Sequence, residues 1–219
     1  MTSGRFITLE GGEGTGKSTQ ARRLAAYLRT LGHEVVETRE PGGSPGAEAV
    51  RHVLLSGAAE PFGAEAEALL FAAARADHLE IVIRPALAAG RIVVCDRFVD
   101  STRVYQGAVG QVPAALLDTL EAATVGGTLP DLTLILDVPP ELGLARAAER
   151  GKGAVADRFE REGTDYHAQV REAFLARAAA APERCVVVDA RGGVDEVAAA
   201  IARIVDARLG LAAPAAASA

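Results

Sequence analysis

The residues with the clearest chemistry lie near the amino terminus, in the stretch GGEGTGKST at residues 11–19. This stretch follows the apolar run FITL and precedes a segment with helical spacing. Gly11, Gly16, Lys17 and Ser18 match the phosphate-binding pattern G-x-x-x-x-G-K-[ST] in full. Glycines let backbone N–H groups curl around an anion, and the start of the next helix adds the positive end of its dipole. The stretch therefore predicts a nucleoside triphosphate site.

We expect this phosphate loop to bind ATP, with Lys17 reaching the terminal phosphates and Ser18 ligating Mg²⁺. Its residues are Gly11, Gly12, Glu13, Gly14, Thr15, Gly16, Lys17, Ser18 and Thr19. A dinucleotide-binding glycine pattern does not fit, because Lys17 stands where its third glycine would be. The remaining alternative is a glycine-rich turn that binds nothing.

Length, composition and charge limit the class of protein. With 219 residues, 49% of them hydrophobic, the chain suits one sizeable domain. A net charge of -6 argues against a nucleic-acid or membrane-surface binder. Cys95 and Cys185 each lie in an apolar run and are predicted to be buried thiols of a cytoplasmic protein, not a disulfide or a metal site. No apolar segment is long enough to predict a membrane span.

Strand and helix patterns alternate along the chain, which predicts an α/β fold with a mostly parallel sheet covered on both faces. We expect five strands, near residues 6, 35, 93, 134 and 186. Helical spacing is found at residues 18–31, 46–56, 65–89 (kinked by Pro85), 113–124, 141–150, 164–180 and 194–209. We predict a single phosphate-loop kinase domain at 1–210, with a mobile lid at about 147–162, and a flexible tail at 211–219.

The terminal phosphate of ATP could go to water or to a second substrate. No guanine-reading Asn-Lys-x-Asp stretch is present, which disfavours a GTPase switch. Arginines, which suit phosphate oxygens, recur at expected strand ends and around the polar insert: Arg39, Arg51, Arg75, Arg97, Arg146, Arg150, Arg158 and Arg161. A polar insert could close as a lid and exclude water. These features favour a second, phosphate-bearing substrate.

Seven motifs, in order, resemble those of the bacterial thymidylate kinases, which transfer the γ-phosphoryl group of ATP to dTMP. The resemblance runs from about residue 6 to residue 204. The motifs are GGEGTGKST (11–19), TREPGG (38–43), FAAAR (71–75), CDRF (95–98), STRVYQG (101–107), PDLTLILDV (130–138) and DRFE (157–160). The resemblance implies a three-layer fold, a homodimer, ATP with Mg²⁺, and dTMP as acceptor.

The resemblance also implies roles around the phosphates. Asp96 would hold Mg²⁺ through water, unless it only caps a helix. Arg97 would bind the acceptor phosphate and bridge it to ATP, and Arg51 would be a further contact; a surface salt bridge is the alternative for Arg97. Glu13 would approach the sugar 3′-hydroxyl, unless it is a solvated loop acid.

For the base, the resemblance implies that Phe71 stacks on thymine and Arg75 hydrogen-bonds a carbonyl. Their i, i+4 spacing places them on one helix face, and a core role is the alternative for Phe71. Tyr105 would close off the 2′ position, Gln106 would touch the base edge, and Ser101 would line the pocket.

The lid departs from the family pattern in part. Gly14 stands where some members carry a catalytic arginine, and members without it supply that charge from the lid. We therefore predict that Arg150 and Arg158 stabilise the transition state together with Lys17 and Arg97. Ala148 interrupts a basic run that is common at the lid entrance, and AVGQ follows YQG in place of a more usual glycine and arginine stretch.

Three other functions remain open at this point. A kinase of the same fold could use another monophosphate or a nucleoside. An ATP-driven switch would turn over ATP without an acceptor. A phosphate-loop ligase would share only the first strand and helix.

Overall fold

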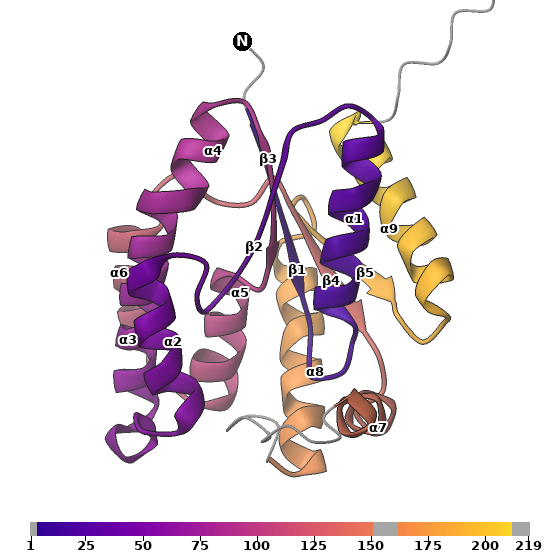
Figure 1. Ribbon diagram of the computed structural model, residues 1–219. Helices are drawn as coiled ribbons and strands as arrows, with labels where there is room; N and C mark the ends of the chain where they lie inside the picture. The colour runs from indigo at the N-terminus through magenta and orange to yellow at the C-terminus, as the bar shows by residue number, and fades with distance from the viewer. Residues whose placement is uncertain (1–3, 151–161, 212–219) are drawn as a thin grey trace, which may run out of the picture.

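The computed structural model describes residues 4–150 and 162–211, and its strands form one parallel sheet (Figure 1). Within these residues the sheet has five strands in the order β2-β3-β1-β4-β5. The strands are β1 (Arg5–Glu10), β2 (Val35–Arg39), β3 (Ile92–Asp96), β4 (Leu132–Asp137) and β5 (Cys185–Asp189). This confirms the predicted fold class, and both cysteines are buried on strands as expected.

Helices cover both faces of the sheet, as Figure 1 shows. On one face lie α1 (Lys17–Thr30) and α9 (Val194–Leu209), where Ile7 and Leu9 share a buried cluster with Leu28. Side chains alternate along a strand, so neighbouring positions of β1 point to the opposite face. One strand thereby anchors helices of both outer layers.

On the other face, Phe6 packs with Ile83 and with Phe98, whose ring centroid is 4.9 Å away. Further along this face, Ile135 packs with Phe174 of the last long helix before β5. The helical elements besides α1 and α9 are α2 (Pro45–Ser56), η1 (Glu60–Phe62), α3 (Gly63–His78), η2 (Leu79–Ile83), α4 (Arg84–Ala88), α5 (Val99–Thr102), η3 (Arg103–Val109), α6 (Ala114–Thr124), α7 (Pro140–Arg150) and α8 (Thr164–Ala180).

Two stretches differ from the sequence prediction. The expected helix at residues 65–89 is interrupted by η2, a π-helical turn that ends two residues before Pro85. Proline has no N–H to donate and crowds the preceding turn, and a local widening of the helix accommodates it. The second difference is a helical segment that the sequence prediction missed, formed by α5 and the π-helical η3. It carries the motif STRVYQG.

The register of the sheet fixes what meets at its carboxyl edge. Leu9 of β1 pairs with Asp96 of β3, and Arg39 of β2 also pairs with Asp96. Because the strands are parallel, the segments that follow them emerge at the same edge. The phosphate loop therefore lies beside the motif CDRF, although some 80 residues separate them in the sequence. Among the described residues, no helix is both long and apolar enough to span a membrane.

A buried ion cluster ties α5 to α8 and to Arg184, the residue before β5. The carboxylate of Asp100 is fully buried and accepts hydrogen bonds from Arg184 (Nη1 at 2.6 Å, Nη2 at 2.8 Å) and from Arg177 Nε (2.7 Å). Arg184 holds the pKa of Asp100 below its usual range despite burial. The cluster anchors the segment that follows CDRF to α8 and to the start of β5.

We expect Asp100→Ala to destabilise the fold by about 3–5 kcal/mol, because it leaves the buried Arg184 and the partly exposed Arg177 without their carboxylate. Urea unfolding measures this change. The matched control is Asp195→Ala, which removes an exposed ion pair with Arg23 and should cost less than about 1 kcal/mol. Equal losses in the two variants would contradict the structural role of Asp100.

Candidate active site

A cavity of about 320 Å³ opens at the carboxyl edge of the sheet. That volume lies within the range of small-molecule sites. Most of the predicted site residues line it: Glu13, Gly14, Gly16, Lys17, Ser18, Thr19, Arg51, Phe71, Arg75, Asp96, Arg97, Ser101, Tyr105 and Gln106. Gly11, Gly12 and Thr15 line a smaller cavity next to α8 instead. The structure thus gathers residues from four motifs around one space.

The phosphate loop holds its lysine ready for an anion. Lys17 is buried, and its Nζ donates a hydrogen bond to the carbonyl of Gly12 at 2.7 Å. Burial, together with the nearby charge of Arg97, lowers the pKa of Lys17 from 10.5 to about 8. A negatively charged group in the loop would reverse this effect, since it favours the protonated form.

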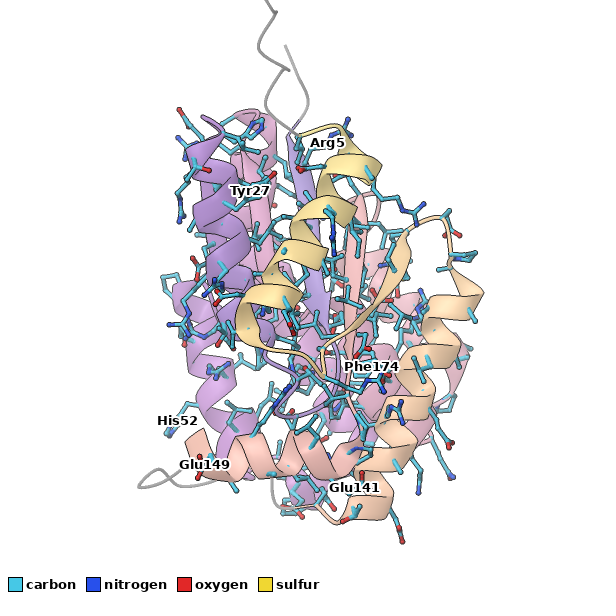
Figure 2. All side chains as sticks on the ribbon, turned by 90° about the vertical axis from the view of Figure 1, so that its right-hand side faces the viewer. Arg5, Tyr27, His52, Glu141, Glu149 and Phe174 are labelled. Carbon is cyan, nitrogen blue, oxygen red and sulfur yellow. The ribbon has the colours of Figure 1, made fainter. Side chains whose placement is uncertain are left out.

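Gly14 is required by close packing against α7. It has a φ of +67°, and a Cβ atom there would lie 1.8 Å from the carbonyl oxygen of Gly143. Figure 2 shows α7 running across this end of the molecule, with Glu141 and Glu149 toward its two ends. An arginine side chain at position 14 would need both a strained backbone and a displaced helix. This packing is a physical reason for the glycine in this loop.

Two oxygen-bearing side chains face each other beside the loop. Ser18 Oγ donates a hydrogen bond to Oδ2 of Asp96 at the end of β3. The other oxygen, Asp96 Oδ1, is buried and has no hydrogen-bond partner within the described parts of the chain. A hydroxyl and a carboxylate with unused acceptor capacity are the ligand types that Mg²⁺ takes. The pair therefore fits a magnesium ion.

Arg97 lines the cavity and contacts several of its other residues. Its Nη2 contacts Glu13 Oε1 at 2.5 Å and Tyr105 Oη at 3.3 Å. Its Nη1 donates to the carbonyl of Gly11 and to Ser101 Oγ, both at 3.1 Å. The guanidinium also stacks over the Tyr105 ring, 5.1 Å from its centroid. Glu13, Ser101 and Tyr105 are thus positioned around one cation.

The backbone of Arg97 is in the left-handed region, with φ of 69°, which non-glycine residues rarely adopt. Glu10, a residue that the sequence analysis did not single out, braces the next peptide. Its Oε1 accepts a hydrogen bond from Phe98 N at 2.7 Å, and its Oε2 accepts one from Ser101 Oγ at 2.6 Å. In the sequence, Glu10 is marked only by being an acidic residue at the end of an apolar strand.

The carboxyl group of Glu10 has a raised pKa. Complete burial and the nearby negative charge of Asp100 raise its pKa from 4.5 to about 7. The hydrogen bonds from Ser101 and Phe98 offset this rise in part.

The opposite wall of the cavity is formed by α2, α3 and η3. Phe71 and Arg75 of α3 line the cavity together, as their spacing predicted. Gln106 is buried and its Nε2 lies 3.4 Å from Glu67 Oε2. Arg51 of α2 donates from Nη1 to the carbonyl of Pro41 at 2.6 Å. This wall combines an aromatic ring with amide and guanidinium donors.

The geometry of the cavity does not test the two predicted lid arginines, Arg150 and Arg158. Arg150 is the last residue of α7. Arg158 lies outside the residues that the structure describes. Their predicted role in catalysis stays a prediction.

Comparisons with known proteins agree on one family. The family model for thymidylate kinase matches residues 9–201. A thymidylate kinase of Caulobacter vibrioides is 56% identical over 211 residues, which cover 96% of this chain and 100% of that protein. A thymidylate kinase of Nitrobacter winogradskyi is also 56% identical, over 198 residues that cover 90% of this chain and 86% of that protein. The solved structure of an Ehrlichia chaffeensis thymidylate kinase superposes with a TM-score of 0.75 at 31% identity, covering 93% of this chain and 99% of that one.

Replacing Glu10 with Gln should change how stability depends on pH. The folded-state pKa lies above the ordinary value, so the wild type should lose stability as the pH rises from about 4.5 to about 7. The full loss is on the order of 3 kcal/mol. Urea unfolding at several pH values measures it as the free energy of unfolding of the wild type minus that of Glu10→Gln. A difference that stays constant across this window would contradict the assignment.

Proposed function

The chain belongs to the thymidylate kinase family and phosphorylates dTMP to dTDP with ATP, and we propose that the cavity at the carboxyl edge is where this transfer takes place. The observation that carries the proposal is the position of Arg97. It lies between the phosphate loop on one side and the wall of α2 and α3 on the other. A single cation at that place can contact two phosphorylated substrates at once.

On the donor side, we propose that residues Gly11–Thr19 wrap the phosphates of ATP. The amino terminus of α1 faces the same space, so its dipole adds to the charge of Lys17. The lowered pKa of Lys17 fits this role, because a bound polyphosphate would return the ammonium group to its charged form.

We also propose that Ser18 and Asp96 hold Mg²⁺. Support comes from the buried, unpaired Oδ1 of Asp96 next to the hydroxyl of Ser18. When bound, the ion supplies neutralisation of the charge that develops on the phosphate oxygens. The protein contributes a fixed serine hydroxyl and a carboxylate at the end of a buried strand.

On the acceptor side, Arg97 and Arg51 bind the phosphate of dTMP in this proposal. Glu13 exchanges its contact with Arg97 for the sugar 3′-hydroxyl when the nucleotide enters. Tyr105 Oη donates a hydrogen bond to Glu13 Oε1 at 3.2 Å, and this contact supports a position of the ring beside the sugar and a preference for deoxyribose. Burial raises the pKa of Tyr105, so the phenol stays neutral at physiological pH.

In this proposal the base lies against the part of the cavity wall that is formed by Phe71, Arg75, Gln106 and Ser101. An aromatic face stacks on thymine, while an N–H donor suits its carbonyl oxygens. These roles rest on the position of the four side chains in the cavity wall.

The chemical step is an in-line displacement. An oxygen of the dTMP phosphate forms a bond to the γ-phosphorus of ATP, the bond from that phosphorus to the bridging oxygen breaks, and ADP leaves. The attacking oxygen is already anionic near neutral pH, so no general base is required. Lys17 and Arg97, with Arg150 and Arg158 from the predicted lid, stabilise the charge of the transition state.

We further propose one kinase domain at 1–210, cytoplasmic and homodimeric. Helices α2 and α3 lie side by side (Figure 1), and this part of the molecule exposes Val53, Phe62 and Leu69. These exposed apolar side chains support pairing through this part of the surface.

The release of ADP from ATP and Mg²⁺ in the presence of different acceptors tests the proposal. We expect fast turnover with dTMP, slower turnover with dUMP, and little with dCMP, dGMP, AMP, UMP or thymidine. Turnover without any acceptor should be negligible, because the attacking oxygen in the proposed step belongs to the acceptor phosphate. Equal turnover without acceptor would instead indicate an ATP-driven switch. A preference for another monophosphate would overturn the base-pocket residues.

A further inference from the structure

The motif TREPGG contributes a buried carboxylate that none of the roles above uses. Glu40 follows β2, and its side chain is only 4% exposed. Its Oε2 accepts a hydrogen bond from Arg75 Nε at 2.8 Å, and its Oε1 lies 3.0 Å from His78 Nδ1. A carboxylate can only accept, so Nδ1 of the histidine carries the proton. Both oxygens of Glu40 are therefore engaged by α3.

The histidine is fixed in turn from the other side. Its Nε2 lies 2.6 Å from the hydroxyl of Thr38, which belongs to the same motif, and His78 is fully buried. Glu40 thus cannot swing away from α3 without breaking a closed set of hydrogen bonds. The carboxylate of Glu40 is therefore held in one position behind the cavity wall.

Because Glu40 is held in place, it also restrains Arg75. While Nε is bonded to Glu40, Nη2 donates to Thr102 Oγ1 at 3.0 Å. The guanidinium is also packed against Phe98, with Cζ 5.2 Å from the ring centroid. Two hydrogen bonds from one planar group define the orientation of its plane. The arginine lines the cavity with this orientation already set.

The next residue of the motif does the same for a second arginine. The carbonyl of Pro41 accepts the hydrogen bond from Arg51, which comes from α2. Two consecutive residues therefore contact the arginine of the base wall and the arginine of the acceptor phosphate. The motif sets the spacing of these two cations.

We propose that Glu40 is a positioning residue that fixes Arg75 for reading the carbonyl group at C4 of the base and so for excluding cytosine. This inference rests on the proposed function of Arg75. Thymine presents an acceptor at C4, whereas cytosine presents an amino donor. A guanidinium held in place cannot turn away from that amino group. Two donors then face each other without an acceptor, and the full loss of binding free energy falls on dCMP. An unanchored guanidinium could move aside and tolerate it.

The test compares wild type with Glu40→Gln in steady-state kinetics with dTMP and with dCMP. We expect the KM for dTMP to rise about tenfold, the effect of losing one charge-assisted hydrogen bond, while the KM for ATP stays unchanged. The ratio of kcat/KM for dTMP to that for dCMP should fall by a similar factor. Glu48→Gln is the matched control, because Glu48 braces the same loop through Gly43 N and Arg39 without contacting Arg75. It should leave the ratio unchanged.

A second background separates positioning from general loosening. In Arg75→Met, the addition of Glu40→Gln should have no further effect on the dTMP/dCMP ratio, because the residue that Glu40 orients is gone. This double variant also removes both charges of the buried pair, so it remains informative if Glu40→Gln alone does not fold. An unchanged ratio in Glu40→Gln, or an equal loss in the Arg75→Met background, would overturn the inference. If Arg75→Met itself left the ratio unchanged, the base-reading role of Arg75 would fail instead.

Discussion

The parallel pairing of β1 with β3 is the constraint on which the rest of the site depends. The ladder continues past Asp96, since Arg97 N donates to the carbonyl of Leu9 at 2.9 Å. This bond fixes the start of the phosphate loop and the start of CDRF against each other. Glu10 then braces the unusual backbone of Arg97 from the same strand. Donor and acceptor sites are adjacent because one strand pair holds both.

The cavity arginines are oriented by other groups of the protein. Arg97 pairs with Glu13, Arg75 with Glu40, and Arg51 with a backbone carbonyl. Burying cations is costly unless they are paired and hydrogen-bonded, and here the partners come from the loops that end β1 and β2. Substrate phosphate can then replace a carboxylate at Arg97 with little reorganisation of the protein. Such preorganisation is the main source of electrostatic catalysis.

The sequence predicted the parts of this arrangement that are local. The phosphate loop, all five strands and the i, i+4 pair on α3 follow from short-range patterns, and the structure has them where expected. The helical segment at 99–109 was missed because part of it is π-helical, so its spacing departs from 3.6 residues per turn. Glu10 and Glu40 could not be singled out, because their partners lie 35 or more residues away and only the folded sheet brings them together. An irregularity near Pro85 was anticipated, but not its form as a π-helical turn.

The central claim is that Lys17 and Arg97 serve two substrates whose phosphates meet in one cavity. The most direct test is the dissociation constant of an analogue in which adenosine and thymidine are joined 5′ to 5′ through a polyphosphate bridge, measured by calorimetry. Linking two ligands of adjacent sites should lower the dissociation constant at least about 100-fold below that of ATP or dTMP alone. A bridged analogue with adenosine at both ends should lack this gain. Affinity no better than that of either nucleotide would show that the two sites do not adjoin.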